Sequence, residues 1–307
     1  IESDDSIVAY WLKPPFSADG WRVDVGNMLG RHDDHQINLE LLRSIRAAVK
    51  RISPEAYLMG ENFFEATEQL QGDGWDAVMN YTGFADPVLH WLTGYEQDAL
   101  RCDAVLKTDI PWDTATMLQA LNENLASIPW QIALQQFNLL DSHDTPRLLT
   151  LLNGDKALSQ LAAIAQFTFP GVPCLYYGDE IGLTNEEGFD SRNCFPWDED
   201  QWDQESLDFY KKLITLRRTS LALARGELRV LYYDQDLVVY ARVLGEEWVL
   251  VTANRSEQAH PAVRLDVPAL NLVGERDFIA LIGSGRIKAG NGWLDLPELS
   301  KGGEVWH

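Results

Sequence analysis

Three carboxylate side chains come at or just after the ends of short apolar runs in this sequence: Asp24, Glu61 and Asp144. Cleavage of a glycosidic bond needs one carboxylate as nucleophile, one carboxylic acid that protonates the leaving oxygen, and further polar groups that hold the sugar. If the three runs are parallel strands of one barrel, their carboxyl ends meet at the same rim. These residue types and their order along the chain predict a site for glycosyl chemistry.

Arg22 and Asp24 belong to the first run, for which we predict a strand over 21–25. Side chains alternate along a strand, so both would share the face that points into the barrel. An arginine at this spacing keeps a carboxylate ionised and oriented, as a nucleophile requires. The alternative is a structural Arg–Asp pair at a strand end, and the presence of the other two acids favours the nucleophile.

Glu61 follows the predicted strand over 56–60, whose last residue is Gly60. We expect Gly60 to let the backbone bend as it leaves the sheet, which would bring Glu61 to the pocket. A glutamic acid that is partly removed from water can stay protonated near neutral pH, as a general acid must. A glutamate in an ordinary loop is the alternative, and only the spacing from Asp24 argues against it.

The pair His143-Asp144 follows the predicted strand over 136–140. A neutral imidazole and a carboxylate supply the donor and the acceptor that neighbouring sugar hydroxyls need. A capping aspartate beside a buried histidine is the alternative. Ser142 precedes the pair, but three consecutive residues cannot fold back into a Ser-His-Asp triad.

Short apolar strands alternate with amphipathic helices from residue 4 to residue 226, which is typical of a parallel α/β arrangement. Five β/α units are predicted, and five cannot close an eight-stranded barrel. Either the sheet is open, or about three strands come from an upstream segment or a separate chain. The predicted strands lie over 21–25, 56–60, 76–81, 136–140 and 172–177, and the helices over 36–51, 65–71, 87–93, 114–126, 155–169 and 205–220.

After Gly226 the apolar residues recur with period two, in predicted strands over 228–233, 237–243 and 248–253. This pattern predicts a small antiparallel β-sandwich. We therefore divide the chain into a catalytic barrel portion at 1–226 and a C-terminal β-sandwich domain at 227–307.

The net charge of −22 argues against nucleic acid and anionic membranes as partners, whereas a neutral carbohydrate would be indifferent to it. Cys102, Cys174 and Cys194 are too few and too scattered for a disulfide framework or a zinc site. They slightly favour a reducing compartment, so we expect a cytoplasmic location. No apolar run is long enough to span a membrane.

Two further segments carry residues with possible roles. His32-Asp33-Asp34-His35 has the side chains of a metal site but lies in a polar stretch before a helix. We expect a solvated loop with a helix cap there, and no metal. Trp197, in the segment 194–197, is a candidate platform for stacking on a sugar ring.

Several segments resemble the α-amylase superfamily, glycoside hydrolase family 13, over essentially the whole chain. They are most similar to its neopullulanase, cyclomaltodextrinase and maltodextrin glucosidase branch. The resemblance implies the C-terminal five β/α units of a (β/α)8 TIM barrel followed by a small antiparallel β-sandwich domain. The segments lie at 19–25, 79–81, 140–145, 171–180 and 195–197.

The resemblance also implies retaining hydrolysis of α-1,4-glucosidic bonds in maltodextrins or cyclodextrins. Asp24 would be the nucleophile, Glu61 the acid and base, and Asp144 would stabilise the transition state. No cofactor is expected to be required, and the sequence does not decide on calcium. The alternatives are a transglycosylase on the same fold and a non-catalytic carbohydrate-binding relative, which would usually lack one of the three acids. The residues expected to bind substrate are Arg22, His143, Arg147 and Trp197.

Overall fold

The structure is a computed structural model that describes residues 3, 5–97, 105–107, 110–185 and 191–307. Its N-terminal part contains five short parallel strands, which follow one another in chain order. β1 pairs with β4 and β4 with β5, a bridge from Met79 to Phe137 continues the series, and β8 pairs with β9. The strands are β1 (Gly20–Val23), β4 (Tyr57–Gly60), β5 (Ala77–Val78), β8 (Phe137–Asn138) and β9 (Val172–Pro173). The predicted five β/α units of a partial barrel are confirmed.

Helices connect these strands, and three of the longer ones begin at an aspartate that caps the helix. Asp113, Asp155 and Asp203 accept a hydrogen bond from the first turns of α4, α7 and α8. The helices are α1 (Ile7–Leu12), α2 (Asn38–Ile52), η1 (Thr67–Leu70), η2 (Tyr81–Ala85), α3 (Asp86–Thr93), α4 (Thr114–Ser127), α5 (Trp130–Ala133), α6 (Leu148–Leu151), α7 (Lys156–Thr168), η3 (Asp179–Ile181), η4 (Glu199–Gln201), α8 (Gln204–Thr219) and α9 (Leu221–Arg225). Two-stranded ribbons are formed by β2 (Arg31–His32) with β3 (His35–Gln36) and by β6 (Tyr95–Gln97) with β7 (Val105–Lys107). Within the described residues, no helix has the length and apolar character needed to cross a bilayer.

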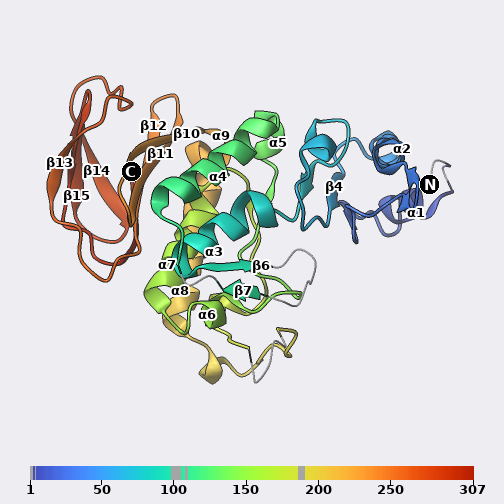
Figure 1. Cartoon of the computed structure of the whole chain (residues 1–307), viewed down its shortest axis with the longest axis horizontal. Coiled ribbons are helices and arrows are strands. Elements are labelled where there is room, and N and C mark those ends of the chain that lie inside the picture. Colours follow the sequence, from blue (N-terminus) through green and yellow to red (C-terminus); the bar gives the residue numbers. More distant parts are fainter. Residues whose placement is uncertain (1–2, 4, 98–104, 108–109, 186–190) are drawn as a thin grey trace.

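The C-terminal part is one antiparallel sheet of eight strands in the order β10-β11-β12-β17-β14-β15-β16-β13. Figure 1 places β13–β15 and the N-terminus at opposite ends of the molecule. β17 comes last in the sequence but lies between β12 and β14. The strands are β10 (Glu227–Tyr233), β11 (Leu237–Leu244), β12 (Glu247–Asn254), β13 (Val263–Asp266), β14 (Arg276–Ile282), β15 (Arg286–Gly290), β16 (Trp293–Leu296) and β17 (Gly302–Trp306).

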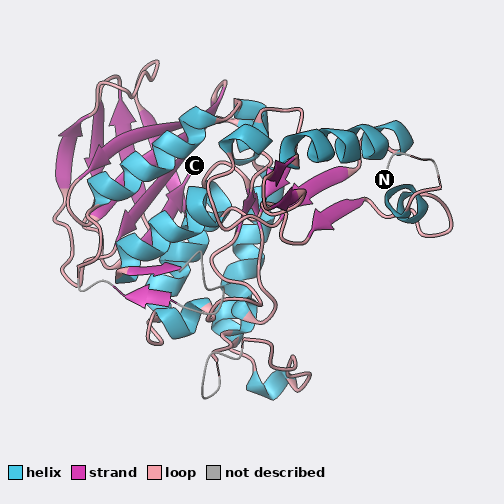
Figure 2. Cartoon of the chain, turned by 45° about the vertical axis from the view of Figure 1, so that its right-hand side comes forward, coloured by secondary structure: helices cyan, strands magenta, loops and turns pink. Residues whose placement is uncertain are grey.

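Strand β11 is buried on both faces, which joins the sheet to the barrel helices (Figure 2). Val239 belongs to the apolar core within the sheet, whereas Val238 and Tyr240 belong to a core shared with α3, α4 and α7. Arg242 on the same strand is fully buried and donates to the main-chain oxygens of Thr168 (2.7 Å) and Gly226 (2.8 Å). Burial lowers the pKa of Arg242 to about 9. These contacts fix the segment that leads from the helices into the sheet.

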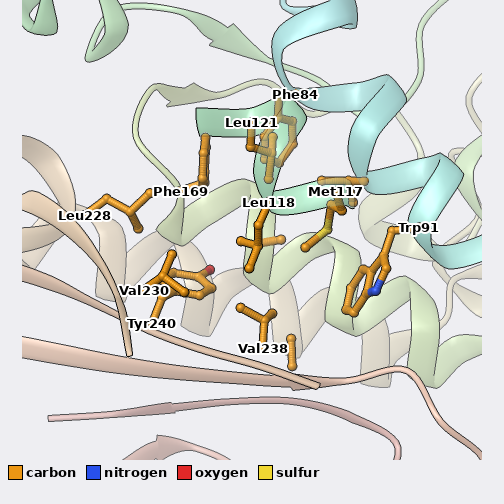
Figure 3. A pocket seen from close by; sticks show the side chains of 13 residues that line it. Phe84, Trp91, Met117, Leu118, Leu121, Phe169, Leu228, Val230, Val238 and Tyr240 are labelled. Carbon is orange, nitrogen blue, oxygen red and sulfur yellow. The ribbon is translucent and has the colours of Figure 1, made fainter. Parts of the chain in front are cut away.

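A small apolar cavity of about 30 Å³ lies where α3, α4 and α7 meet strands β10–β12 (Figure 3). Met117, Leu118 and Val238 are among the side chains that line it. A cavity of this size leaves room for about one extra methylene group, and filling such a space stabilises a core.

Replacing Val238 by Ile is therefore expected to raise the free energy of unfolding by about 0.5–1 kcal/mol. Val239→Ile is the matched control, since Val239 is fully buried on the opposite face and does not line the cavity. It should lower the free energy of unfolding by about 1–3 kcal/mol through overpacking. Denaturant unfolding measures both, and equal changes in the two variants would contradict the role of the cavity.

Candidate active site

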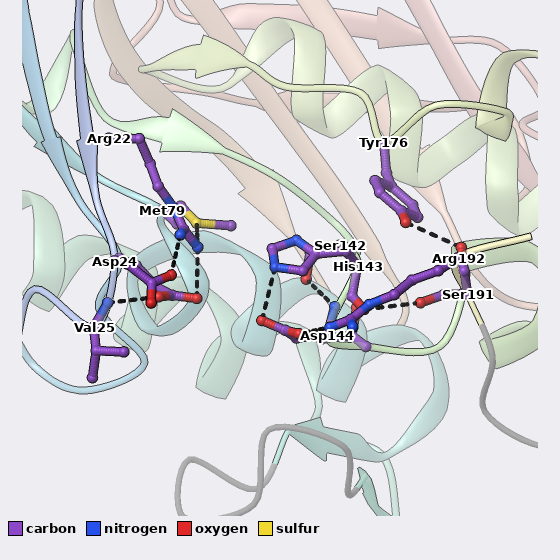
Figure 4. Close-up of polar contacts among 12 residues, drawn as sticks. Arg22, Asp24, Val25, Met79, Ser142, His143, Asp144, Tyr176, Ser191 and Arg192 are labelled. Atoms are coloured by element: carbon purple, nitrogen blue, oxygen red, sulfur yellow. Dashed lines mark hydrogen bonds and ion pairs between the residues drawn. The ribbon is translucent and has the colours of Figure 1, made fainter.

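One guanidinium group holds two of the predicted acids together. Arg22 Nη1 lies 2.5 Å from Asp24 Oδ1, and its Nη2 lies 2.6 Å from Glu61 Oε1. Asp24 is the first residue after β1 and its side chain is 76% exposed, whereas Glu61 follows β4 and is 5% exposed. Arg22, Asp24 and Val25 form one of the two polar groups in Figure 4. The structure thus brings together an open carboxylate and a buried one.

The strand register explains why these acids meet. β1 and β4 are parallel with Val23 opposite Gly60, so Asp24 and Glu61 come next on adjacent strands. Val25 then has φ of +47°, a left-handed conformation that is strained for a β-branched residue. This turn lets the Val25 N–H donate to Glu61 Oε2 at 2.7 Å. The buried carboxylate is therefore held by Arg22 and by the backbone of the loop that follows β1.

The reason for a glycine at position 60 differs from our expectation. Gly60 is not among the residues with positive φ, so a special backbone conformation does not require it. A Cβ at this position would lie 2.6 Å from the Trp75 indole, which is closer than side-chain carbons come to other atoms. Gly60 therefore provides room for Trp75 beneath Glu61, and the bend expected after it stays a prediction.

His143 and Asp144 lie on the same rim as Glu61 and form part of the second polar group in Figure 4. His143 Nε2 is 3.1 Å from Asp144 Oδ2, and one polar atom from each of Glu61, His143 and Asp144 falls within 4.8 Å of the others. Ser142 Oγ accepts hydrogen bonds from the Asp144 N–H (3.1 Å) and the Tyr81 hydroxyl (2.8 Å). Ser142 is thus an anchor for the backbone of this segment.

Arg192 is a site residue that the sequence did not indicate. Its Nη2 lies 2.5 Å from Asp144 Oδ1, and its Nε donates to the main-chain oxygen of His143 at 2.8 Å. Arg192 belongs to the loop after β9, 48 residues from Asp144, and no motif marks it. An arginine after the last predicted strand was the only available signal.

Arg147 does not occupy the place that we predicted for it. Its side chain is fully buried, lies over the rings of Tyr176 and Tyr177, and donates to the main-chain oxygens of Tyr177 (2.7 Å) and Ser191 (3.0 Å). The prediction that Arg147 contacts substrate is wrong. Its bond to Ser191 instead supports the loop that carries Arg192.

Two buried carboxyl groups lie beside Arg147. Asp141 and Asp179 are hydrogen-bonded to each other, and Arg147 Nη1 is 3.8 Å from Asp179 Oδ1. Burial raises the pKa of both carboxyl groups. A hydrogen bond between two carboxyl groups needs one proton, so the pair is held partly protonated beneath the site.

Asp179→Asn is expected to remove a pH dependence of stability. A carboxyl whose pKa is raised on folding binds its proton more tightly in the native state, so this stability is present at low pH and is lost as pH rises from about 4 through the raised pKa. Asparagine keeps a hydrogen-bond donor and does not ionise. In urea unfolding, the free energy of unfolding of the variant should therefore rise relative to that of the wild type as pH rises above about 4. Asp208→Asn, on the surface, is the control. A wild type whose free energy of unfolding rises relative to that of Asp179→Asn with rising pH would contradict the prediction.

Three other predicted residues or segments lie away from these contacts. Trp197 is 84% exposed and packs against Phe195 with ring centroids 4.9 Å apart, so its contact with a sugar stays a prediction. The segment His32–His35 is an exposed two-stranded turn, as expected of a solvated loop. Ile37 is the N-cap of α2 and makes no side-chain cap bond, so the predicted helix cap is wrong. Cys102 lies outside the described residues.

Comparison with known proteins agrees with this geometry. The family model described as "Alpha amylase, catalytic domain" matches residues 2–208. The chain is 38% identical over 255 residues to a cyclomaltodextrinase of Geobacillus thermopakistaniensis, covering 82% of this chain and 39% of that protein. It is 32% identical over 252 residues to an intracellular maltogenic amylase of Bacillus subtilis, covering 81% and 39%.

Solved structures give the same result for the fold. The native form of the Nostoc punctiforme debranching enzyme superposes with a TM-score of 0.80 at 33% identity. The match covers 98% of this chain and 60% of that one. The chain therefore spans about two fifths of the length of the curated relatives and three fifths of this solved structure.

Proposed function

Because this chain belongs to the alpha-amylase family, we propose that it carries the site of a retaining glycoside hydrolase for α-1,4-glucosidic bonds of maltodextrins or cyclodextrins. The observation that carries the proposal is the Arg22 guanidinium bound to both Asp24 and Glu61. One of these carboxylates is open to a ligand, and the other is buried beside it, which suits a nucleophile and a proton donor. The names of the relatives support the substrate class.

The proposed reaction has two steps. In the first, Asp24 forms a bond to the anomeric carbon while the glycosidic bond breaks and Glu61 gives its proton to the leaving oxygen. In the second, Glu61 takes a proton from water, whose oxygen bonds to the anomeric carbon as the bond to Asp24 breaks. Glu61 must hold a proton and release Arg22 before it can act as an acid, since both its oxygens accept hydrogen bonds in this structure.

His143, Asp144 and Arg192 form the opposite side of the site. His143 and Asp144 offer a donor and an acceptor for neighbouring sugar hydroxyls, and Asp144 supplies negative charge to an oxocarbenium-like transition state. Arg192 orients Asp144 through its side chain and His143 through its main chain. The proposed two-step chemistry requires no cofactor.

The test is an assay of the complete protein on maltotriose, γ-cyclodextrin and pullulan. We expect release of reducing sugars of retained α configuration, measured by NMR at the first turnovers. Products longer than the substrate would point to the transglycosylase alternative. Absence of turnover on all three substrates, with folding verified by circular dichroism, would overturn the proposal.

We also propose that further strands complete the barrel. Within the described residues, β1 and β9 each have a strand neighbour on one side only. Exposed strand edges of this kind are normally paired or covered. The added units would come from elsewhere in the polypeptide or from a separate chain. We therefore expect residues 1–307 expressed by themselves to be insoluble or inactive on maltodextrins, and a soluble, fully active 307-residue protein would contradict this.

The remaining predictions stay proposals of the same kind. We place the catalytic part at 1–226 and the accessory β-domain at 227–307, on either side of the change from α9 to β10. A cytoplasmic location is in line with the name of the Bacillus subtilis relative.

A further inference from the structure

Three buried amide side chains form a chain of hydrogen bonds behind the site. Asn62 Nδ2 donates to Gln69 Oε1 at 2.5 Å, and Gln69 Nε2 donates to Asn38 Oδ1. Asn38 Nδ2 then donates to the main-chain oxygens of Gly26 (3.2 Å) and Leu29 (2.6 Å). All three side chains are at most 5% exposed, so water does not compete for these bonds.

The two ends of this chain of amides lie next to the two reacting carboxylates. Asn62 directly follows Glu61, and Gly26 comes two residues after Asp24. Gln69 lies in η1 and Asn38 at the start of α2. The amides therefore link the loop that carries Glu61 to the loop that carries Asp24, by way of η1 and α2.

The loops also touch directly, so their spacing is tightly determined. A Cβ added at Gly26 would lie 3.2 Å from Asn62 Oδ1, 3.1 Å from the Trp75 ring and 3.2 Å from Gly60 Cα. There is thus no room for a side chain at Gly26, and the two segments are also bonded directly through the Val25 N–H and Glu61 Oε2. The proton donor of a retaining enzyme must stand at a set distance from its nucleophile, and small displacements are costly.

We propose that Asn38, Gln69 and Asn62 are positioning residues that hold Glu61 at its working distance from Asp24. The inference rests on the proposed function, because it assigns Glu61 the part of proton donor. Gln69 is the central link, since it both accepts from Asn62 and donates to Asn38. Methionine at position 69 has nearly the same length and removes both bonds.

The test compares Gln69→Met with Gln136→Met in the complete protein. Gln136 is as buried as Gln69 and also bonds in both directions, but its partners, the main chain of Ile132 and of Val78 beside Gly60, do not connect the two loops. The value of kcat/KM is measured on γ-cyclodextrin and on an aryl α-maltoside with a good leaving group. This quantity reports the first step, which needs the proton of Glu61 only for the first substrate.

For Gln69→Met we expect kcat/KM to fall about 10–100-fold on γ-cyclodextrin and less than about threefold on the aryl maltoside. For Gln136→Met the two substrates should be affected equally. Equal losses on both substrates in Gln69→Met, or no loss on either, would overturn the inference. If Gln69→Met does not fold, Asn38→Ala replaces it, with the same expected difference in loss between the two substrates. A wild type that acts on neither substrate would overturn both the proposed function and this inference. In an active enzyme, equal losses on the two substrates would overturn this inference alone.

Discussion

Asp24→Asn should lower kcat on γ-cyclodextrin by about 10⁴-fold or more, because an amide cannot form the glycosyl-enzyme bond. The change is isosteric, and the side chain is 76% exposed with Arg22 as its ion-pair partner. Its effect on the free energy of unfolding should therefore stay within about 0.5 kcal/mol. Steady-state kinetics and urea unfolding of the complete protein measure the two quantities.

Asp19→Asn is the matched control for this experiment. Asp19 is exposed at the other end of the same strand, directly before β1, so the substitution removes the same charge far from the rim. It should leave kcat unchanged. An Asp24→Asn enzyme with near-normal activity would exclude Asp24 as the nucleophile.

Glu61→Gln should have an effect that depends on the leaving group of the substrate. Without a proton donor, kcat/KM on γ-cyclodextrin should fall about 10²–10⁴-fold. On an aryl α-maltoside with a good leaving group, kcat/KM should stay within about tenfold of the wild type, because that bond breaks without protonation. Glutamine can still accept one of the bonds from Arg22 or Val25, so the loop should keep its place.

Glu55→Gln controls for the loss of a carboxylate near the same strand. Glu55 is exposed and lies before β4, at the end opposite to Glu61. It should not change kcat/KM on either substrate. If Glu61→Gln lowered kcat/KM equally on both substrates, Glu61 would have a role other than proton donation.

Local patterns predicted the elements of this chain well. The helices predicted over 36–51, 114–126, 155–169 and 205–220 correspond to α2, α4, α7 and α8, because their apolar patterns depend on residues close in sequence. The meeting of Arg22, Asp24 and Glu61 was also predictable, since parallel strands of one sheet end at one edge. The lengths of the strands were not predictable in this way, since β9 ends at Pro173 and does not continue to residue 177.

The supporting residues of the site depend on contacts between distant segments. Arg147 resembled a ligand residue because it is charged and close to Asp144, but Ser191, 44 residues further on, determines its place inside the protein. Arg192 has no motif around it, because the loop after β9 brings it to Asp144 only in the folded protein. The reason for a glycine at position 60 is the nearby Trp75 ring, whose position follows only from the packing of the folded sheet.

The position of β17 has a consequence for biosynthesis. A ribosome delivers residues 302–306 after all the other strands, yet these residues lie in the middle of the sheet, between β12 and β14. Until they emerge, β12 and β14 each lack a neighbour on one side, and the apolar surface of α7 that Val305 covers in the folded protein is open. The nascent polypeptide must therefore pass through a stage in which its two halves of sheet are separate and prone to aggregate, and a chaperone that shields β12 would act at this stage.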